Sequence, residues 1–374
     1  GHRRGSQTRR SSRSRRWSRS AQTLFASWAV LGQLGGMGVL VADVVEPSVA
    51  QAQITEIPGS RGGTNDTAAN AFGEGAFAIG VGAHSGGDTT SHFNSIAIGT
   101  DANATGDSAI AIGAGANATG NAGEVSGRGF RSVALGVDSK AQNDQAIAVG
   151  AGSEALGAKS SAFGYLAKAN ANISTAIGST ATATEEGATA IGSQAAATNS
   201  FTTAIGRAAE ASGEESTALG QSAEASDYRT VALGVNALAI SSRSIAIGTE
   251  TISSGVNSTA LGVDSKAEGL QSTAIGYGAS ASSVDSTALG EQTSASGERS
   301  TALGAGAEAR GMNSTALGHE AMAKAGQSIA IGRGAVAETY GTAALGSSSQ
   351  AIGNRSLAVG VSAEATGVCS MAVG

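Results

Sequence analysis

Side chains that could support covalent or metal chemistry are few in this chain and are not clustered. Of the four histidines, only His84 and His92 lie near each other, and two imidazoles alone are a weak metal signal. The single cysteine, Cys369, excludes an intrachain disulfide and a cysteine-based zinc site. The chain also lacks a nucleophile elbow, a Ser-His-Asp pattern and the calcium nonapeptide repeat. We therefore expect no catalytic residues, no metal and no cofactor.

Side chains suited to binding stand out in two segments that interrupt a repeat. These segments span residues 81–94 and 114–132, and they contribute the candidate binding residues His92, Phe93, Arg128, Phe130 and Arg131. Loops that interrupt a solenoid carry residues that the coil itself does not need. Exposed aromatic and arginine side chains are common anchors of protein interfaces. Such segments either bind a partner or form bulges that pack on the repeat.

The repeat has the pattern Ser-x-Ala-φ-Gly, in which φ is Ile, Leu, Val or Phe. Its closing glycine recurs every fourteen residues from Gly136 to Gly374, and earlier copies end at Gly80, Gly99 and Gly113. Short runs with β-branched residues that end in glycine predict strands. Alternation along a strand places φ and the residue two before it on one face. The residue between them is always alanine, which predicts two layers that meet closely there.

A second and weaker strand follows each closing glycine. Small residues occupy alternate positions in it, as at Ala102 and Ala104 or at Ala307 and Ala309. Each unit is therefore strand, turn, strand and turn, which is one coil of a parallel β-solenoid. Stacking at about 4.8 Å per coil gives a length of about 95 Å. A helix is disfavoured because its interior would contain many glycines, and a disordered segment has no reason to keep a strict phase.

Charge is divided unequally along the chain. The first twenty residues contain eight arginines and no acid, which leaves 15 basic and 29 acidic residues in the rest, since the totals are 23 and 29. An acidic body repels the phosphate backbone, so nucleic acid is not an expected partner. Residues 1–52 combine the arginines, an apolar stretch and an Ala-x-Ala site, as an extended signal peptide does. The alternative is a retained anchor over Leu24–Ala42. Residues 53–75 are expected to form a linker or cap.

The apolar residues of such a thin coil predict association. Aromatic residues make up only 3% of the chain, so the coil cannot enclose a thick core. One apolar face would stay exposed along the whole stack, and a continuous patch of that size marks an association surface. Closed cyclic symmetry would bury it, although these considerations do not fix the number of chains.

Several copies of the repeat resemble the head repeats of YadA-like trimeric autotransporter adhesins, whose motif is N-S-V-A-I-G-x-x-S. The matching segments are Asn94–Gly99 (NSIAIG), Arg131–Ser139 (RSVALGVDS), Asn257–Ser265 (NSTALGVDS) and Asn313–Gly318 (NSTALG). The resemblance covers residues 76–374. It implies an all-β fold, a left-handed parallel β-roll of fourteen-residue coils assembled as a homotrimer.

The same resemblance implies a function and a location. It implies type V secretion across the inner membrane, a place at the bacterial outer membrane or cell surface, and attachment to host matrix proteins such as collagen or fibronectin, or cell–cell aggregation. No membrane contact by the head is implied. The stalk and membrane anchor of the family are not found in this chain. The family motif adds the candidate binding residues Asn94, Ser95, Asn257, Ser258, Ser265, Asn313 and Ser314.

Three other functions fit the repeat less well. An ice-binding solenoid presents a ladder of threonines, but here Thr217 shares its face with Leu219. A polysaccharide-cleaving β-helix needs larger coils and clustered acidic or basic residues, whereas the acids here are scattered. A structural spacer of a surface fibre remains an alternative to the adhesin.

Overall fold

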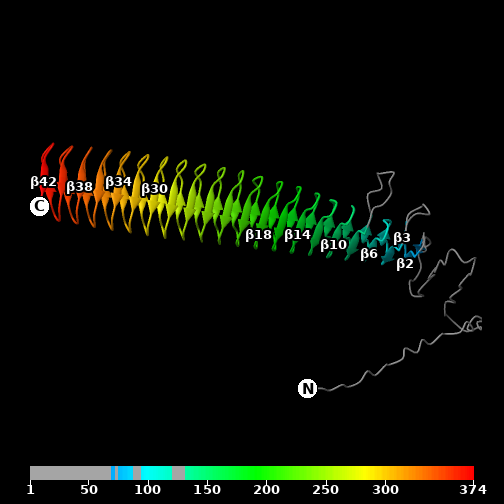
Figure 1. Cartoon of the computed structure of the whole chain (residues 1–374). Coiled ribbons are helices and arrows are strands. Elements are labelled where there is room, and N and C mark those ends of the chain that lie inside the picture. The colour runs from blue at the N-terminus through cyan, green and yellow to red at the C-terminus, as the bar shows by residue number, and fades with distance from the viewer. Residues whose placement is uncertain (1–68, 72–74, 87–93, 120–130) are drawn as a thin grey trace, which may run out of the picture. The chain divides into compact units, whose positions relative to one another are not determined.

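The computed structural model describes residues 69–71, 75–86, 94–119 and 131–374. In this part of the chain all regular structure is β-strand, from β1 (Asn70–Ala71) to β42 (Met371–Val373). None of the described residues forms a helix long and apolar enough to cross a bilayer. The predicted signal peptide lies outside the described residues. The expected all-β solenoid is confirmed, and its strands stack in a single row (Figure 1).

Two kinds of strand alternate along the chain and form two parallel sheets. Even-numbered strands have three residues, such as β8 (Val133–Leu135) and β10 (Ile147–Val149), and odd-numbered strands have two, such as β9 (Lys140–Ala141). Each strand pairs with the next of its own kind, so Val133 lies opposite Ile147, fourteen residues later. Every coil therefore uses the previous coil as its template.

The two interruptions leave the ladders unbroken. Phe77 of β2 (Phe77–Ile79) pairs with Ile96 of β4 (Ile96–Ile98), and Ile110 of β6 (Ile110–Ile112) pairs with Val133. The extra residues fall after the short strands, because β3 (His84–Ser85) and β7 (Asn117–Ala118) keep their places in the other sheet. The stack begins before the predicted boundary at residue 76, since β1 pairs with β3.

One coil, Ser258–Gln271, serves to number the fourteen positions. Position 1 is Ser258, positions 2–4 are β26 (Thr259–Leu261), and position 5 is Gly262. Positions 9 and 10 are β27 (Lys266–Ala267), and position 14 is Gln271. The first turn spans positions 5–7 and the second spans positions 12–14. All other coils are numbered in the same way.

The interior of the stack contains only small side chains. Alanine fills position 3, as at Ala246 and Ala260, and alanine or serine fills position 10, as at Ala267 and Ser253, each with an exposed fraction of 0%. Alanine, serine or threonine fills positions 1 and 8. The predicted close contact of two layers at the invariant alanine is thus confirmed. The larger apolar side chains all point outward, which inverts the arrangement of an ordinary globular core.

A left-handed backbone conformation recurs at every seventh residue. Positions 7 and 14 have positive φ even where the residue is not glycine, for example Arg243 (φ 57) and Ile173 (φ 59). The cost is offset because the backbone N–H at these positions is used by the stack: that of Arg243 donates to Tyr228 O in the preceding coil at 2.8 Å. Position 5 tolerates only glycine. At Gly220 (φ 141) a Cβ would overlap the carbonyl oxygen of Gly234 in the next coil.

Candidate binding surfaces

The described residues contain no cluster of side chains that could hold a metal ion. No three side chains of His, Cys, Asp or Glu come together among them. The candidate His84 is part of β3 at position 9, not part of the extra loop. The candidate binding sites are therefore extended surfaces. Two sheet faces and two turn edges run the length of the stack.

The outward face of the three-residue strands, here called the apolar face, consists of positions 2 and 4. Position 4 is Ile, Leu, Val or Phe in every coil from Ile79 to Val373. These side chains are half-buried or exposed, with exposed fractions that reach 40% at Leu219 and Leu261. A continuous apolar column is unusual on a soluble monomer, so the apolar face is a candidate association surface.

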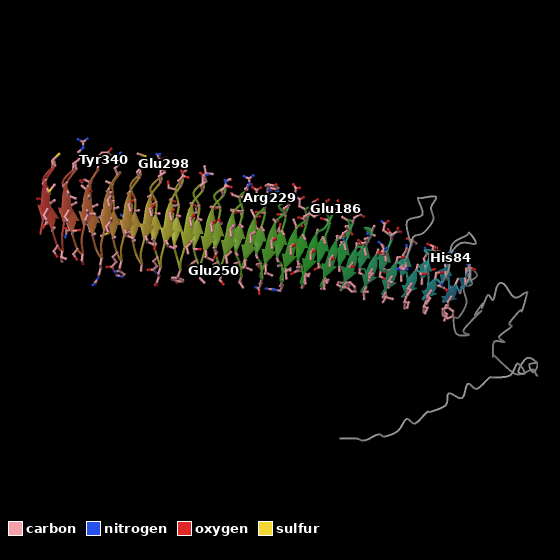
Figure 2. The ribbon with its side chains drawn as sticks, in the orientation of Figure 1. His84, Glu186, Arg229, Glu250, Glu298 and Tyr340 are labelled. Atoms are coloured by element: carbon pink, nitrogen blue, oxygen red, sulfur yellow. The ribbon has the colours of Figure 1, made fainter. Side chains whose placement is uncertain are left out.

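The second surface, here called the turn edge, consists of positions 13 and 14 of the second turn. Figure 2 shows Glu186, Arg229, Glu298 and Tyr340 along this edge and Glu250 along the opposite one. Four sequence-predicted residues, Asn94, Arg131, Asn257 and Asn313, all occupy position 14 of this edge with φ between 56 and 63. Asparagine tolerates the left-handed region better than most residues, so turn geometry also explains the three asparagines.

Ion pairs link neighbouring coils along the surface. Arg229 donates from Nε to Glu215 Oε2 at 2.6 Å and from an Nη to Oε1 at 3.3 Å, fourteen residues earlier in the chain. This hydrogen bond with Arg229 holds the pKa of the Glu215 carboxyl below its ordinary value. Lys140 and Glu154 pair at 2.9 Å on the sheet of two-residue strands. Both pairs join equivalent positions of adjacent coils, so they reinforce the parallel stack.

Comparison with known families matches the same coils. The model of the YadA head domain repeat matches residues 93–121, 128–153, 155–251, 253–279 and 281–374, which is well over half of the chain. The chain belongs to the YadA head repeat family. A solved structure, the collagen-binding domain of the Yersinia adhesin YadA, is similar with 23% identity and a TM-score of 0.25, over 31% of this chain and 69% of that one. A comparison with curated proteins finds no match.

The serines of the YadA head motif lie inside the coil. Ser95, Ser258 and Ser265 have exposed fractions of 0%, and Ser314 has 1%. Ser258 Oγ donates to Gly255 O at 2.6 Å, and Ser265 Oγ donates to Gly262 O at 3.0 Å. These hydroxyl groups close the turns from within. In the single chain they are not available to a ligand, so of the candidate binding residues that the motif supplied, the asparagines are the ones that face solvent.

The remaining predicted residues divide between the described and undescribed parts of the chain. His92, Phe93, Arg128 and Phe130 lie outside the described residues. Arg131 is exposed at position 14, immediately before the coil that follows the second interruption. Its backbone N–H donates to Asp107 O at 3.0 Å, so it belongs to the ladder despite the extra residues between them.

The turn edge also carries apolar side chains that the sequence pattern did not single out. They occupy position 13 in the C-terminal half, with exposed fractions of 38–45%: Val256, Leu270, Val284, Met312 and Tyr340. The ring of Tyr340 covers the backbone of Gly326, since a Cβ there would lie 3.4 Å from Tyr340 Cδ2. Several coils nearer the N-terminus have acidic residues at position 13, such as Asp144, Glu186 and Glu214. These residues could have been found from the sequence, because each lies two residues before the buried serine or threonine at position 1.

Proposed function

We propose that this chain is the head of a bacterial surface adhesin that binds extracellular matrix proteins of the collagen or fibronectin type. Membership of the YadA head repeat family supports this proposal most directly. The described surface offers contact area and no clustered catalytic groups. A long row of equivalent coils suits a repetitive ligand, because many weak contacts act together through their effective concentration.

Three chains are proposed to pack around one axis through their apolar faces. Burial of the position 4 column would remove the exposed leucines and isoleucines from water. The turn edge and the polar outward face of the short strands would then be available for the ligand. We further propose that residues 1–52 direct export across the inner membrane, after which the head is displayed at the outer membrane.

The turn edge is the proposed contact with the matrix protein. It combines apolar residues at position 13 with arginines at position 14, namely Arg131, Arg229, Arg243, Arg299 and Arg355. Aromatic, methionine and arginine side chains are enriched in the centres of protein interfaces. The candidate asparagines Asn94, Asn257 and Asn313 are the polar members of the same edge.

Binding of the purified chain to immobilised collagen and to fibronectin tests the function. The turn-edge variant Arg243→Ser with Arg355→Ser should lower the amount bound at least several-fold. The matched control, Arg207→Ser with Arg333→Ser, removes the same charge from position 6 on the opposite edge and should bind like the unchanged chain. Equal losses in both variants would point to net charge, and the absence of binding to either matrix protein would contradict the proposed ligand.

A structural spacer is the second candidate, and the uniformity of the coils favours it. From Gly136 to Gly374 no coil departs from the fourteen-residue length. A spacer would show trimer formation but no retention on collagen, fibronectin or whole cells. The ice-binding alternative would instead show thermal hysteresis, and the apolar position 4 beside each outward threonine argues against it.

A further inference from the structure

Position 2 of the apolar face alternates in type along the stack, whereas position 4 is apolar throughout. Blocks of apolar residues are separated by blocks of serine and threonine. In chain order the position 2 residues are Phe77, Ile96, Ile110, Val133 and Ile147; Ser161, Thr175, Thr189, Thr203 and Thr217; Val231 and Ile245; Thr259, Thr273, Thr287, Thr301 and Thr315; and Ile329, Ala343, Leu357 and Met371. Each of these blocks is here called a band.

The bands follow a longer period than the coil. The two polar bands have five coils each, and they begin at Ser161 and Thr259, which are 98 residues or seven coils apart. The coil backbone does not require this period, because all coils from Val133 onward share one length and one hydrogen-bond register. The bands therefore differ only in their side chains, and these side chains lie on the apolar face.

We propose that the bands fix the axial register in which copies of this chain assemble through their apolar faces. This inference rests on the proposed trimer and names what aligns it. Identical coils at a constant spacing let one copy slide along another by whole coils without changing the fit of the backbones. Position 4 cannot prevent such a slip, because it presents an apolar side chain in every coil. Repetitive faces specify register weakly unless side chains break the repetition.

The bands make a slipped assembly unfavourable. In register, each layer contains three copies of one residue, so apolar residues meet apolar residues and threonines meet threonines. A slip of one coil sets a threonine or serine against an apolar residue at the four band boundaries, for example Thr217 against Val231. A hydroxyl group buried against a hydrocarbon side chain loses its hydrogen-bond partners. Larger slips mismatch more layers.

Direction is set by symmetry and not by the bands. The band pattern is close to a palindrome, so it would also fit an antiparallel pair. Three copies around one closed axis must run parallel, because a threefold axis relates all of them by rotation. The proposed assembly is therefore parallel and in register, with equal residue numbers in each layer.

A mixing experiment tests the proposal. The shifted-band variant Thr203→Val, Thr217→Ile, Val231→Thr, Ile245→Thr exchanges two coils of one band with two of the next and keeps the composition. Each chain should form trimers with its own copies. When mass-tagged unchanged and variant chains are refolded together, native mass spectrometry should show mixed trimers at least several-fold below the binomial proportion, since four layers would be mismatched.

The matched control alters the same four coils on the other face. In the variant Glu210→Leu, Glu224→Ile, Leu238→Glu, Ile252→Glu, the exchanged residues occupy position 9 of the short strands. This chain should mix with the unchanged one in binomial proportion. Binomial mixing of the shifted-band variant would overturn the register proposal and leave the trimer intact. A mass of one chain for the unchanged protein would instead overturn the trimer itself, and equal exclusion by both variants would show that the bands have no special role.

Discussion

At the scale of the residue, the interior of the coil sets the tightest limit on the sequence. Positions 3 and 10 accept a methyl group and little more, because the two sheets meet there without a layer of larger side chains. Alanine at these positions is fully buried in coil after coil along the stack, with 0% exposure. Stability therefore comes from many identical small contacts and from backbone hydrogen bonds between coils.

Replacement of Ala246 by leucine should unfold the chain more easily. Ala246 pairs in register with Ala232 and Ala260, so extra carbon atoms there have no space on either side. Overpacking of this kind costs about 1–3 kcal/mol. The control is Ala196→Leu at the outward position 9, where the side chain is partly exposed. Chemical denaturation followed by circular dichroism measures both, and equal midpoints would contradict a tight interior.

The glycine at position 5 gives a second residue-scale prediction. Gly220→Ala should destabilise the chain by more than about 2 kcal/mol, because its φ of 141 and the carbonyl of Gly234 both oppose a Cβ. Gly278→Ala is the comparison: its φ is 61, and the nearest atom to a Cβ is Gln292 Cγ at 3.6 Å. It should cost only about 1–2 kcal/mol. Thermal unfolding of the two variants separates close contact from backbone conformation.

At the scale of the element, each short strand ends in a turn that must satisfy the carbonyl groups of the next coil. Where position 12 is glycine, its N–H contributes, as from Gly213 to Ala225 O at 3.3 Å. Where position 12 is polar, its side chain donates to the carbonyl of position 11 in the next coil, as from Ser241 Oγ to Ser254 O at 2.6 Å and from Thr339 Oγ1 to Ile352 O at 2.8 Å. Glycine and polar residues at position 12 thus bond different carbonyl groups of the next coil, those of positions 10 and 11.

The pair Glu215–Arg229 should make the link between its two coils dependent on pH. The pKa of Glu215 is lowered in the folded chain, so the stabilisation is present above the ordinary value of 4.5 and is lost as the pH falls through the lowered pKa. Glu215→Gln should therefore flatten the fall in melting temperature on acidification. Arg229→Gln should flatten it equally, and the double variant should add nothing. Additive effects of the two substitutions would show that the pair is not coupled.

The sequence predicted the coil more fully than it predicted the surface. The fourteen-residue period, the two strands and the buried alanine all follow from strict phase, because a repeat reports the same packing many times. The left-handed conformation at Arg243 or Ile173 could not be predicted, since those residues have no local preference for it and the stack imposes it. The buried state of Ser258 was missed for a related reason: serine is usually exposed, and only the turn geometry places it inside.

At the scale of the whole molecule, the outward leucines and isoleucines are the basis of the proposed association. Ordinary solvation explains single exposed apolar residues, but not one in every coil along a straight column. The polar face of the short strands lacks such a column, since position 9 includes Lys140, Glu154, Glu210 and Lys266. Association through one face and contact with the ligand through another would let one thin coil both assemble with its copies and bind the ligand.

A charge placed on the apolar face should separate the copies without unfolding the coil. Leu261 is 40% exposed at position 4, and Leu261→Asp would place a carboxylate in the centre of the proposed trimer, where burial of an unpaired charge is strongly unfavourable. Light scattering should show three chains before the substitution and a shift toward one chain after it, with unchanged strand content. Ile240→Asp is the matched control, because Ile240 is 42% exposed on the polar face and should leave the mass at three chains. Dissociation by the control alone would place the association surface on the short strands and reverse the assignment of the two faces.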